Sequence, residues 1–118
     1  MHELPNIDLL GLSCKNYTKN ELKFSTAKIK ELLKLVSGWE VNQSTDESAI
    51  PFIYRDFKFK DYYQTLAFIN AVVWIVHQED HHPEITIRYN TCHIEFSTHS
   101  IKGLSLNDFI CAAKINHI

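Results

Sequence analysis

Apolar residues recur at helical spacing in two long stretches of the chain. The first begins at residue 25 or 26 and stops at Gly38, a residue that suits the left-handed position following a helix. The second begins at residue 60 or 61 and must end before Pro83, because the residue before a proline is disfavoured in a helix. The expected core faces are Ile29, Leu32, Leu33 and Val36 in the first helix, and Tyr62, Leu66, Ile69, Val73 and Val76 in the second.

Extended patterns occupy the space between and after these helices. Residues 39–41 predict a short strand, and residues 50–59, rich in β-branched and aromatic side chains, predict a longer one. Two alternating stretches on either side of Asn90 predict a hairpin with one buried face. Its inward residues are expected to be Ile85, Ile87 and Tyr89 in one strand and Cys92, Ile94, Phe96 and Thr98 in the other.

A third helix is predicted after Ser105, with Leu106, Phe109, Ile110 and Ala113 at helical spacing. The element order is then α-β-β-α-β-β-α. This order favours an α+β fold, with a four-stranded antiparallel sheet and helices packed on one face. Residues 25–118 form the predicted single domain, and residues 1–24 an extended lead-in. The opposite sheet face would need cover, for which a partner subunit is one candidate.

Composition and charge narrow the class of protein. The 118 residues are 45% hydrophobic with a net charge of −2, which favours one globular domain and gives no reason to expect nucleic acid as a partner. Three cysteines without CxxC spacing argue against a disulfide framework. The N-terminal residues lack the pattern of a signal peptide, and no apolar run is long enough for a membrane span. We expect a cytoplasmic protein.

Histidines and a carboxylate occupy positions that the predicted fold could bring together. His81 and His82 stand directly before Pro83, where the long helix ends and the next strand begins. The hairpin then returns the chain, so His99 and Asp108 could lie beside that pair. Histidine exchanges protons near neutral pH, since its unperturbed pKa is about 6.5. The pattern favours acid–base chemistry at this corner.

Each of these residues also has a purely structural interpretation. His81 and His82 could cap the helix C-terminus, where the helix dipole favours positive charge. Asp108 could complete a capping box with Ser105, a role compatible with a second role in the site. His93 lies on the outward side of its strand and is expected to face solvent.

A zinc site is the other chemical interpretation. His77 and His81 are four residues apart and could share a helix face, but the HExxH pattern of zinc enzymes is missing. The cysteines also lack the spacing of zinc ligands. We expect no metal; a metal-dependent hydrolase would instead carry stoichiometric zinc and lose activity with a chelator.

These residues and their spacing resemble the signature of the pterin-4a-carbinolamine dehydratases, also called 4a-hydroxytetrahydrobiopterin dehydratases. The resemblance covers most of residues 25–117, and residues 1–24 are not covered well. It rests on His77-x-x-x-His81-His82-Pro83-Glu84, Tyr89, Ser97-Thr98-His99 and Gly103-Leu104-Ser105-x-x-Asp108, with Gly38-Trp39-Glu40, Phe57-x-Phe59-x-Asp61-Tyr62 and Leu66-Ala67-Phe68 upstream.

The resemblance implies a hydro-lyase that converts 4a-hydroxytetrahydropterin to quinonoid dihydropterin, and so recycles the cofactor of aromatic amino acid hydroxylases. The pterin is the substrate, and no cofactor or metal is implied. His81 and His99 would be the acid–base groups and His82 would hold the pterin. Asp108 would support them, and we expect it to orient His99 or keep it charged. The remaining substrate contacts are expected from Pro83, His77 and Thr98.

One residue departs from the family pattern, and one alternative function stays open. His77 stands where the family often has glutamate, so we expect activity with a displaced pH optimum.

The expected partners are the pterin, a second copy in a homodimer or homotetramer, and an aromatic amino acid hydroxylase, with no nucleic acid or membrane. The alternative is a non-enzymatic interaction module, since the family also resembles a vertebrate dimerisation cofactor of a homeodomain transcription factor. Retention of both catalytic histidines favours the enzyme.

Overall fold

The computed structural model describes residues 7–18, 21–42, 46 and 48–118, and its element order confirms the predicted α+β fold. Each α-helix begins at a polar side chain that accepts a backbone N–H, namely Ser25, Asp61 and Ser105. The elements are η1 Leu9–Gly11, α1 Thr26–Leu33, β1 Glu40–Val41, β2 Ile53–Lys58, α2 Tyr62–Glu79, β3 Glu84–Ile87, β4 Thr91–Phe96, η2 His99–Ile101 and α3 Leu106–Asn116.

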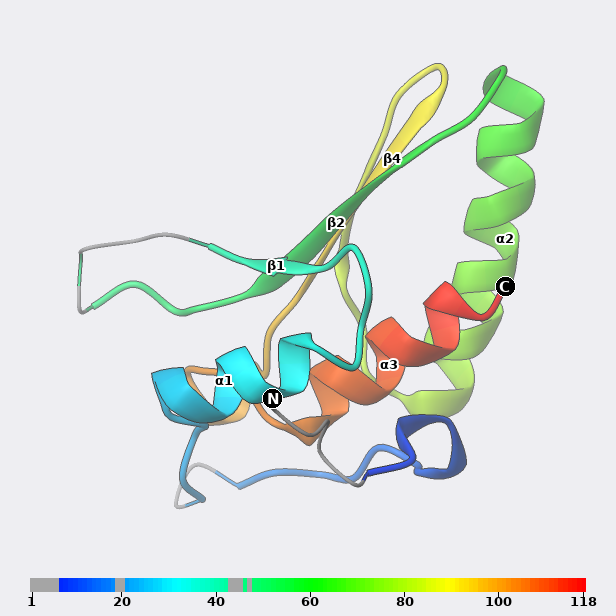
Figure 1. Cartoon of the computed structure of the whole chain (residues 1–118). Coiled ribbons are helices and arrows are strands. Elements are labelled where there is room, and N and C mark those ends of the chain that lie inside the picture. Colours follow the sequence, from blue (N-terminus) through cyan, green and yellow to red (C-terminus); the bar gives the residue numbers. More distant parts are fainter. Residues whose placement is uncertain (1–6, 19–20, 43–45, 47) are drawn as a thin grey trace.

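The strands form one antiparallel sheet in the order β1-β2-β4-β3. β2 and β4 pair from Ile53 opposite Phe96 to Lys58 opposite Thr91. Figure 1 shows α2 alongside the sheet, with α1 and α3 beneath the strands in this view. β4 ends at Phe96, and η2 begins at the candidate residue His99. Thr98 is still buried and His99 is exposed, so the chain reaches the surface at His99.

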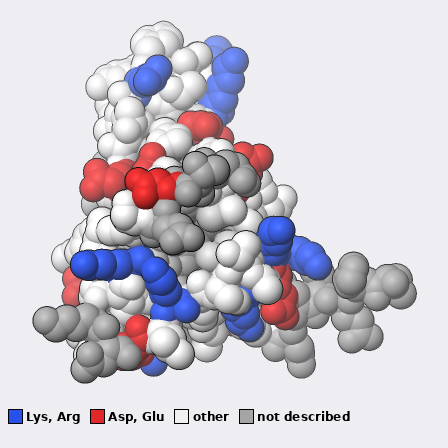
Figure 2. All heavy atoms as spheres, turned by 90° about the vertical axis from the view of Figure 1, so that its left-hand side faces the viewer, with Lys and Arg blue, Asp and Glu red and all other residues white. Residues whose placement is uncertain are grey.

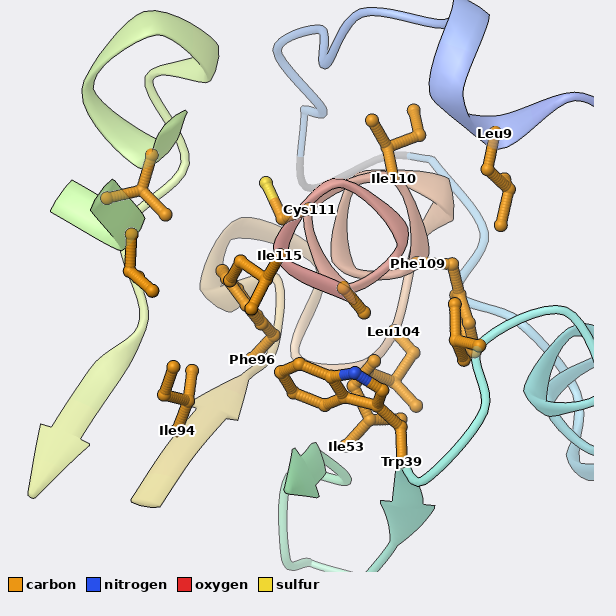
Figure 3. Packing of buried hydrophobic residues seen from close by; sticks show 14 of the residues in the cluster. Leu9, Trp39, Ile53, Ile94, Phe96, Leu104, Phe109, Ile110, Cys111 and Ile115 are labelled. Carbon is orange, nitrogen blue, oxygen red and sulfur yellow. The ribbon is translucent and has the colours of Figure 1, made fainter. Parts of the chain in front are cut away.

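The core lies between the inner face of the sheet and α3. β4 alternates as predicted, with Cys92, Ile94 and Phe96 fully buried. Figure 3 shows Phe96 and Ile115 between α3 and the strands. α3 is buried around most of its surface, at Asn107, Asp108, Phe109, Ile110, Cys111, Ala112 and Ile115. Polar side chains in the first turn of α3 therefore need hydrogen-bond partners inside the protein.

The predicted core face of α2 is wrong for part of its length. Tyr62 and Val73 are each 48% exposed. Residues 71–76 are all apolar, so the spacing alone permits two neighbouring faces. The structure buries Thr65, Ile69, Val72 and Val76. Thr65 can be buried because its hydroxyl donates to a backbone carbonyl. Among the described helices, none combines the length and apolar character needed to cross a membrane.

The predicted hairpin is confirmed, but its edge strand is not buried on the predicted face. Ile85 is half-buried, whereas Ile87 and Tyr89 are 44% and 66% exposed. β3 is the edge of the sheet and ends at Ile87, so Tyr89 lies in the turn, where its ring stacks on Tyr62. Of the two hairpin strands, β4 shows the alternation of a strand with one buried face and β3 does not.

Part of the predicted lead-in packs on the helices. Residues 1–6 and 19–20 of that segment lie outside the described residues. η1 contacts α3, and Leu9 belongs to the hydrophobic core. Further along, the Cys14 N–H donates to a carboxylate oxygen of Glu79 at 2.8 Å, which brings residues near position 15 to the end of α2.

Candidate active site

The end of α2 places His81 in the interior. Asp80 takes the left-handed conformation (φ 51°, ψ 42°), which ends the helix before Pro83 as predicted. The His81 ring then stacks on Phe96, with ring centres 5.7 Å apart and planes inclined by 9°. Its Nε2 lies 2.7 Å from Oδ1 of Asp108, and its side chain is only 12% exposed. His81 is therefore held on one side by a core aromatic ring and at one nitrogen by a carboxylate.

Asp108 is fully buried, and both of its oxygens are hydrogen-bonded. Oδ2 accepts from the Thr98 hydroxyl at 2.8 Å and from the Ser105 N–H at 3.0 Å. Since the Thr98 proton goes to Asp108, the Ser105 hydroxyl donates to Thr98 Oγ1 across 2.7 Å. The predicted capping box of Ser105 and Asp108 is confirmed, and the same carboxylate also holds His81. This network fixes the carboxylate in one orientation.

A surface pocket of about 410 Å³ opens beside this pair. His81, His82 and His99 all line it, so the predicted convergence of the three imidazoles is confirmed. Thr98 also contributes to its wall. The other lining residues are Lys15, Asn16, Tyr17, Asp80, Ser100 and Asn107. His82 and His99 are exposed and His81 is not, so the pocket offers one anchored imidazole and two solvent-accessible ones.

The expected partner of Asp108 is corrected by this geometry. We expected the carboxylate to orient His99, but it holds His81 instead. The reason lies in the alternation of β4 and the residues after it. Thr98 continues the inward set and meets Asp108, whereas His99 falls on the outward parity and begins η2 at the surface.

The other predicted contact residues have different settings. His77 is exposed on the last turn of α2 and does not line the pocket. Pro83 follows the pocket residues His81 and His82 but is not part of the lining. Thr98 is 5% exposed and serves Asp108 through its hydroxyl. Substrate binding by these three residues stays a prediction.

Sequence reasoning missed one wall of the pocket. Lys15, Asn16 and Tyr17 line it, and Asn107 holds them from the first turn of α3. No local pattern relates residue 15 to residue 107, which lie 92 positions apart in the chain. The buried amide of Asn107 requires hydrogen-bond partners, but its burial is apparent only in the structure.

A cluster of one imidazole and two carboxylates lies on the outer face of the sheet, at the predicted outward position of His93. Its Nδ1 is 2.7 Å from Asp56 and its Nε2 is 2.8 Å from Glu95. Partial burial alone would lower the pKa of His93, but the hydrogen bonds to both carboxylates outweigh it and raise the pKa. In the described part of the chain, no three His, Cys, Asp or Glu side chains are placed to hold a metal ion.

The surface charge of the molecule is mixed on the face that Figure 2 draws. Acidic side chains gather across its middle, with basic side chains above and below them. This distribution agrees with the net charge of −2, and that view shows no extended basic surface among the described residues.

Comparison with known proteins supports a single family. The family model for pterin 4 alpha carbinolamine dehydratase matches residues 22–118. A protein of Nitrosospira multiformis named "Putative pterin-4-alpha-carbinolamine dehydratase" is 48% identical over 109 residues, covering 92% of this chain and 90% of its own length. One of the same name from Xanthomonas campestris pv. campestris is 50% identical over 111 residues, covering 92% and 90%.

Solved structures agree with this assignment at the level of the fold. A transcriptional coactivator/pterin dehydratase of Brucella melitensis superposes with a TM-score of 0.70 at 30% identity, covering 81% of this chain and 97% of its own. A pterin dehydratase-like RuBisCO assembly factor of the alpha-carboxysome shares the fold, with a TM-score of 0.56 at 19% identity, covering 70% and 90%. This chain belongs to the pterin 4 alpha carbinolamine dehydratase family.

Proposed function

We propose that this chain dehydrates 4a-hydroxytetrahydropterin to quinonoid dihydropterin by histidine acid–base catalysis, and so recycles the cofactor of aromatic amino acid hydroxylases. The observation that carries the proposal is an imidazole, His81, held by a buried carboxylate in a pocket that two further imidazoles line. In the reaction the C4a–O bond breaks and the oxygen leaves as water, which requires a proton on the hydroxyl. A second proton leaves the ring system, so the quinonoid product is neutral.

The arrangement suits two proton transfers. Nε2 of His81 faces Asp108, and no described residue hydrogen-bonds its Nδ1, which leaves that nitrogen for the substrate. Asp108 orients the ring and stabilises the positive charge that develops on it during transfer. His99 is exposed and can return its proton to water. Each positioned transfer typically contributes about 10²–10⁴-fold to the rate. His82 binds the pterin in this proposal, and Thr98 positions Asp108.

The test is a rapid-mixing absorbance assay of 4a-hydroxytetrahydropterin dehydration against the spontaneous rate. Wild type should accelerate the reaction, and His81→Ala and His99→Ala should each lose most of the acceleration while remaining folded. His93→Ala is the matched control, because it removes an imidazole outside the pocket, and it should keep the activity. Folded wild type without acceleration would sink the proposal.

The exposed face of α2 supports a proposal of self-association. Tyr63 and Trp74 on α2 are 82% and 61% exposed, and burial of these rings against another copy would be favourable. We therefore propose a homodimer or homotetramer, which light scattering of wild type and Trp74→Glu would test. Equal masses of the two proteins would count against this face as the interface.

A second candidate function comes from the name of the Brucella relative, which describes that protein as both a transcriptional coactivator and a pterin dehydratase. An interaction module is thus the second candidate function, favoured by an inactive but self-associating wild type.

A further inference from the structure

One wall of the pocket is formed by residues that precede the start of the family-model match, and hydrogen bonds from α2 and α3 hold it in place. Residues 14–17, called here the strap, precede the start of the family match at residue 22. We propose that the strap is a specificity-determining wall for the pterin ring and that Asn107 is the positioning residue that holds it over the pocket. This inference rests on the proposed function and concerns how the same site recognises its substrate.

The side-chain amide of Asn107 makes two hydrogen bonds to the backbone of one strap residue, Lys15. Its Oδ1 accepts from the Lys15 N–H at 3.0 Å, and its Nδ2 donates to the Lys15 carbonyl at 2.6 Å. The Asn107 side chain is 4% exposed. Burying an amide is unfavourable unless its hydrogen bonds are made, and here they are made to the strap. A pair of bonds to one residue fixes the orientation of the strap as well as its position.

Glu79 fixes the strap at its first residue. One oxygen accepts from the Cys14 N–H at 2.8 Å, and the other lies 2.7 Å from the Lys114 ammonium. Burial alone would raise the pKa of Glu79, but Lys114 and the Cys14 N–H outweigh it and lower the pKa. The ionised form that makes both contacts is thus favoured at neutral pH. Three elements, α2, α3 and the strap, meet at this carboxylate.

The first turn of α3 therefore serves both sides of the pocket. Asn107 holds the strap and the next residue, Asp108, holds His81. Both side chains are buried, and they are fixed relative to each other by one turn of helix. The spacing between the strap and His81 is consequently set by the helix and not by loop flexibility. Such a fixed spacing suits recognition of a flat ring.

The strap lines this space with an aromatic ring and with Lys15, whose ammonium also lies 3.7 Å from a carboxylate oxygen of Glu21. Tyr17 is half-buried and lines the pocket, and the Lys15 ammonium lies 4.7 Å above the centre of its ring. An aromatic ring can stack on a planar heterocycle, and an ammonium group can donate to a carbonyl oxygen. A pterin has both features, a planar fused ring and a carbonyl. The strap thus contributes to binding, while the protons are moved by histidines.

The experiment separates binding from chemistry. Asn107→Ala should raise KM for 4a-hydroxytetrahydropterin about tenfold with kcat within about twofold, because two hydrogen bonds to the strap are lost. Hydrogen exchange at the Lys15 amide should also accelerate. Tyr17→Ala removes a pocket side chain outside the core and should raise KM without lowering Tm, which keeps the test valid if Asn107→Ala unfolds.

Asn116→Ala is the matched control. Asn116 is an α3 amide that accepts from Trp39 and Arg55, and it does not line the pocket. Its loss should lower Tm and leave KM unchanged. Unchanged KM in Asn107→Ala and Tyr17→Ala, or a rise no larger than that of Asn116→Ala, would overturn the strap proposal while the proposed function stands. A wild type that neither dehydrates the substrate nor binds a stable dihydropterin would overturn both.

Discussion

Two imidazole–carboxylate contacts of the same length occupy opposite settings in this molecule. His81 meets Asp108 at 2.7 Å inside the protein, and His93 meets Asp56 at 2.7 Å on the outer face of the sheet. The carboxylate of Asp108 is fully buried, whereas the side chain of Asp56 is 68% exposed. The distance alone therefore does not distinguish a candidate catalytic pair from a surface ion pair.

The two histidines differ in what their second nitrogen does. Glu95 occupies the second nitrogen of His93, so both ring nitrogens are engaged within the sheet surface. His81 uses one nitrogen on Asp108 and, among the described residues, keeps the other free beside a pocket. A general acid or base needs a ring nitrogen that is free to exchange a proton with the substrate. Of these two imidazoles, only His81 has one.

The strongest way to break this comparison is to neutralise one carboxylate in each cluster. Asp108→Asn should lower kcat by about 10²–10⁴-fold, because the charge that stabilises a protonated His81 is removed. Asp56→Asn should leave kcat within about twofold, since His93 lies outside the pocket. Steady-state dehydration assays on both folded variants measure the contrast. Equal losses would mean that the two contacts are not functionally different.

A smaller effect is expected from the hydroxyl that orients Asp108. Thr98→Val removes a donor to the buried carboxylate and leaves the Ser105 hydroxyl without its acceptor. Unfolding should become easier by about 1–3 kcal/mol, the usual cost of unsatisfied buried polar groups. We expect kcat to fall about tenfold, less than in Asp108→Asn, because the Ser105 N–H still holds the carboxylate.

Thr86→Val on the exposed side of β3 is the control for this change. It should alter the free energy of unfolding by less than about 0.5 kcal/mol, as surface substitutions usually do. Urea unfolding monitored by circular dichroism compares the two variants. If Thr98→Val were as stable and active as Thr86→Val, the hydroxyl network would not position Asp108.

Local patterns predicted the fold and the meeting of the three pocket histidines. Helix caps, the hairpin alternation and Pro83 are each encoded within a few residues, and they suffice to bring His99 back toward His81. The partner of Asp108 could also have been inferred, since Thr98, and not His99, continues the inward alternation of β4.

Other features depend on contacts that no short pattern carries. The buried face of α2 was ambiguous because residues 71–76 are all apolar, and tertiary packing buries Val72 in place of Val73. The strap joins residue 15 to residue 107 through the backbone N–H and carbonyl of residue 15, which every residue type except proline would supply. Such a contact leaves almost no signature in one sequence.

The subtlest expected difference between the clusters is the pH dependence that His93 confers. Its pKa in the folded protein is raised by the two carboxylates, relative to about 6.5 in the unfolded chain. A raised folded pKa gives a stability contribution that is fully present below the unfolded pKa and is lost as pH rises through the folded value. His93→Gln should therefore destabilise the protein more at pH 6 than at pH 9, measured by urea unfolding. NMR titration should show the His93 ring losing its proton above pH 6.5. A ring that titrates at or below the ordinary value, with equal destabilisation at both pH values, would show that the carboxylates do not outweigh its burial.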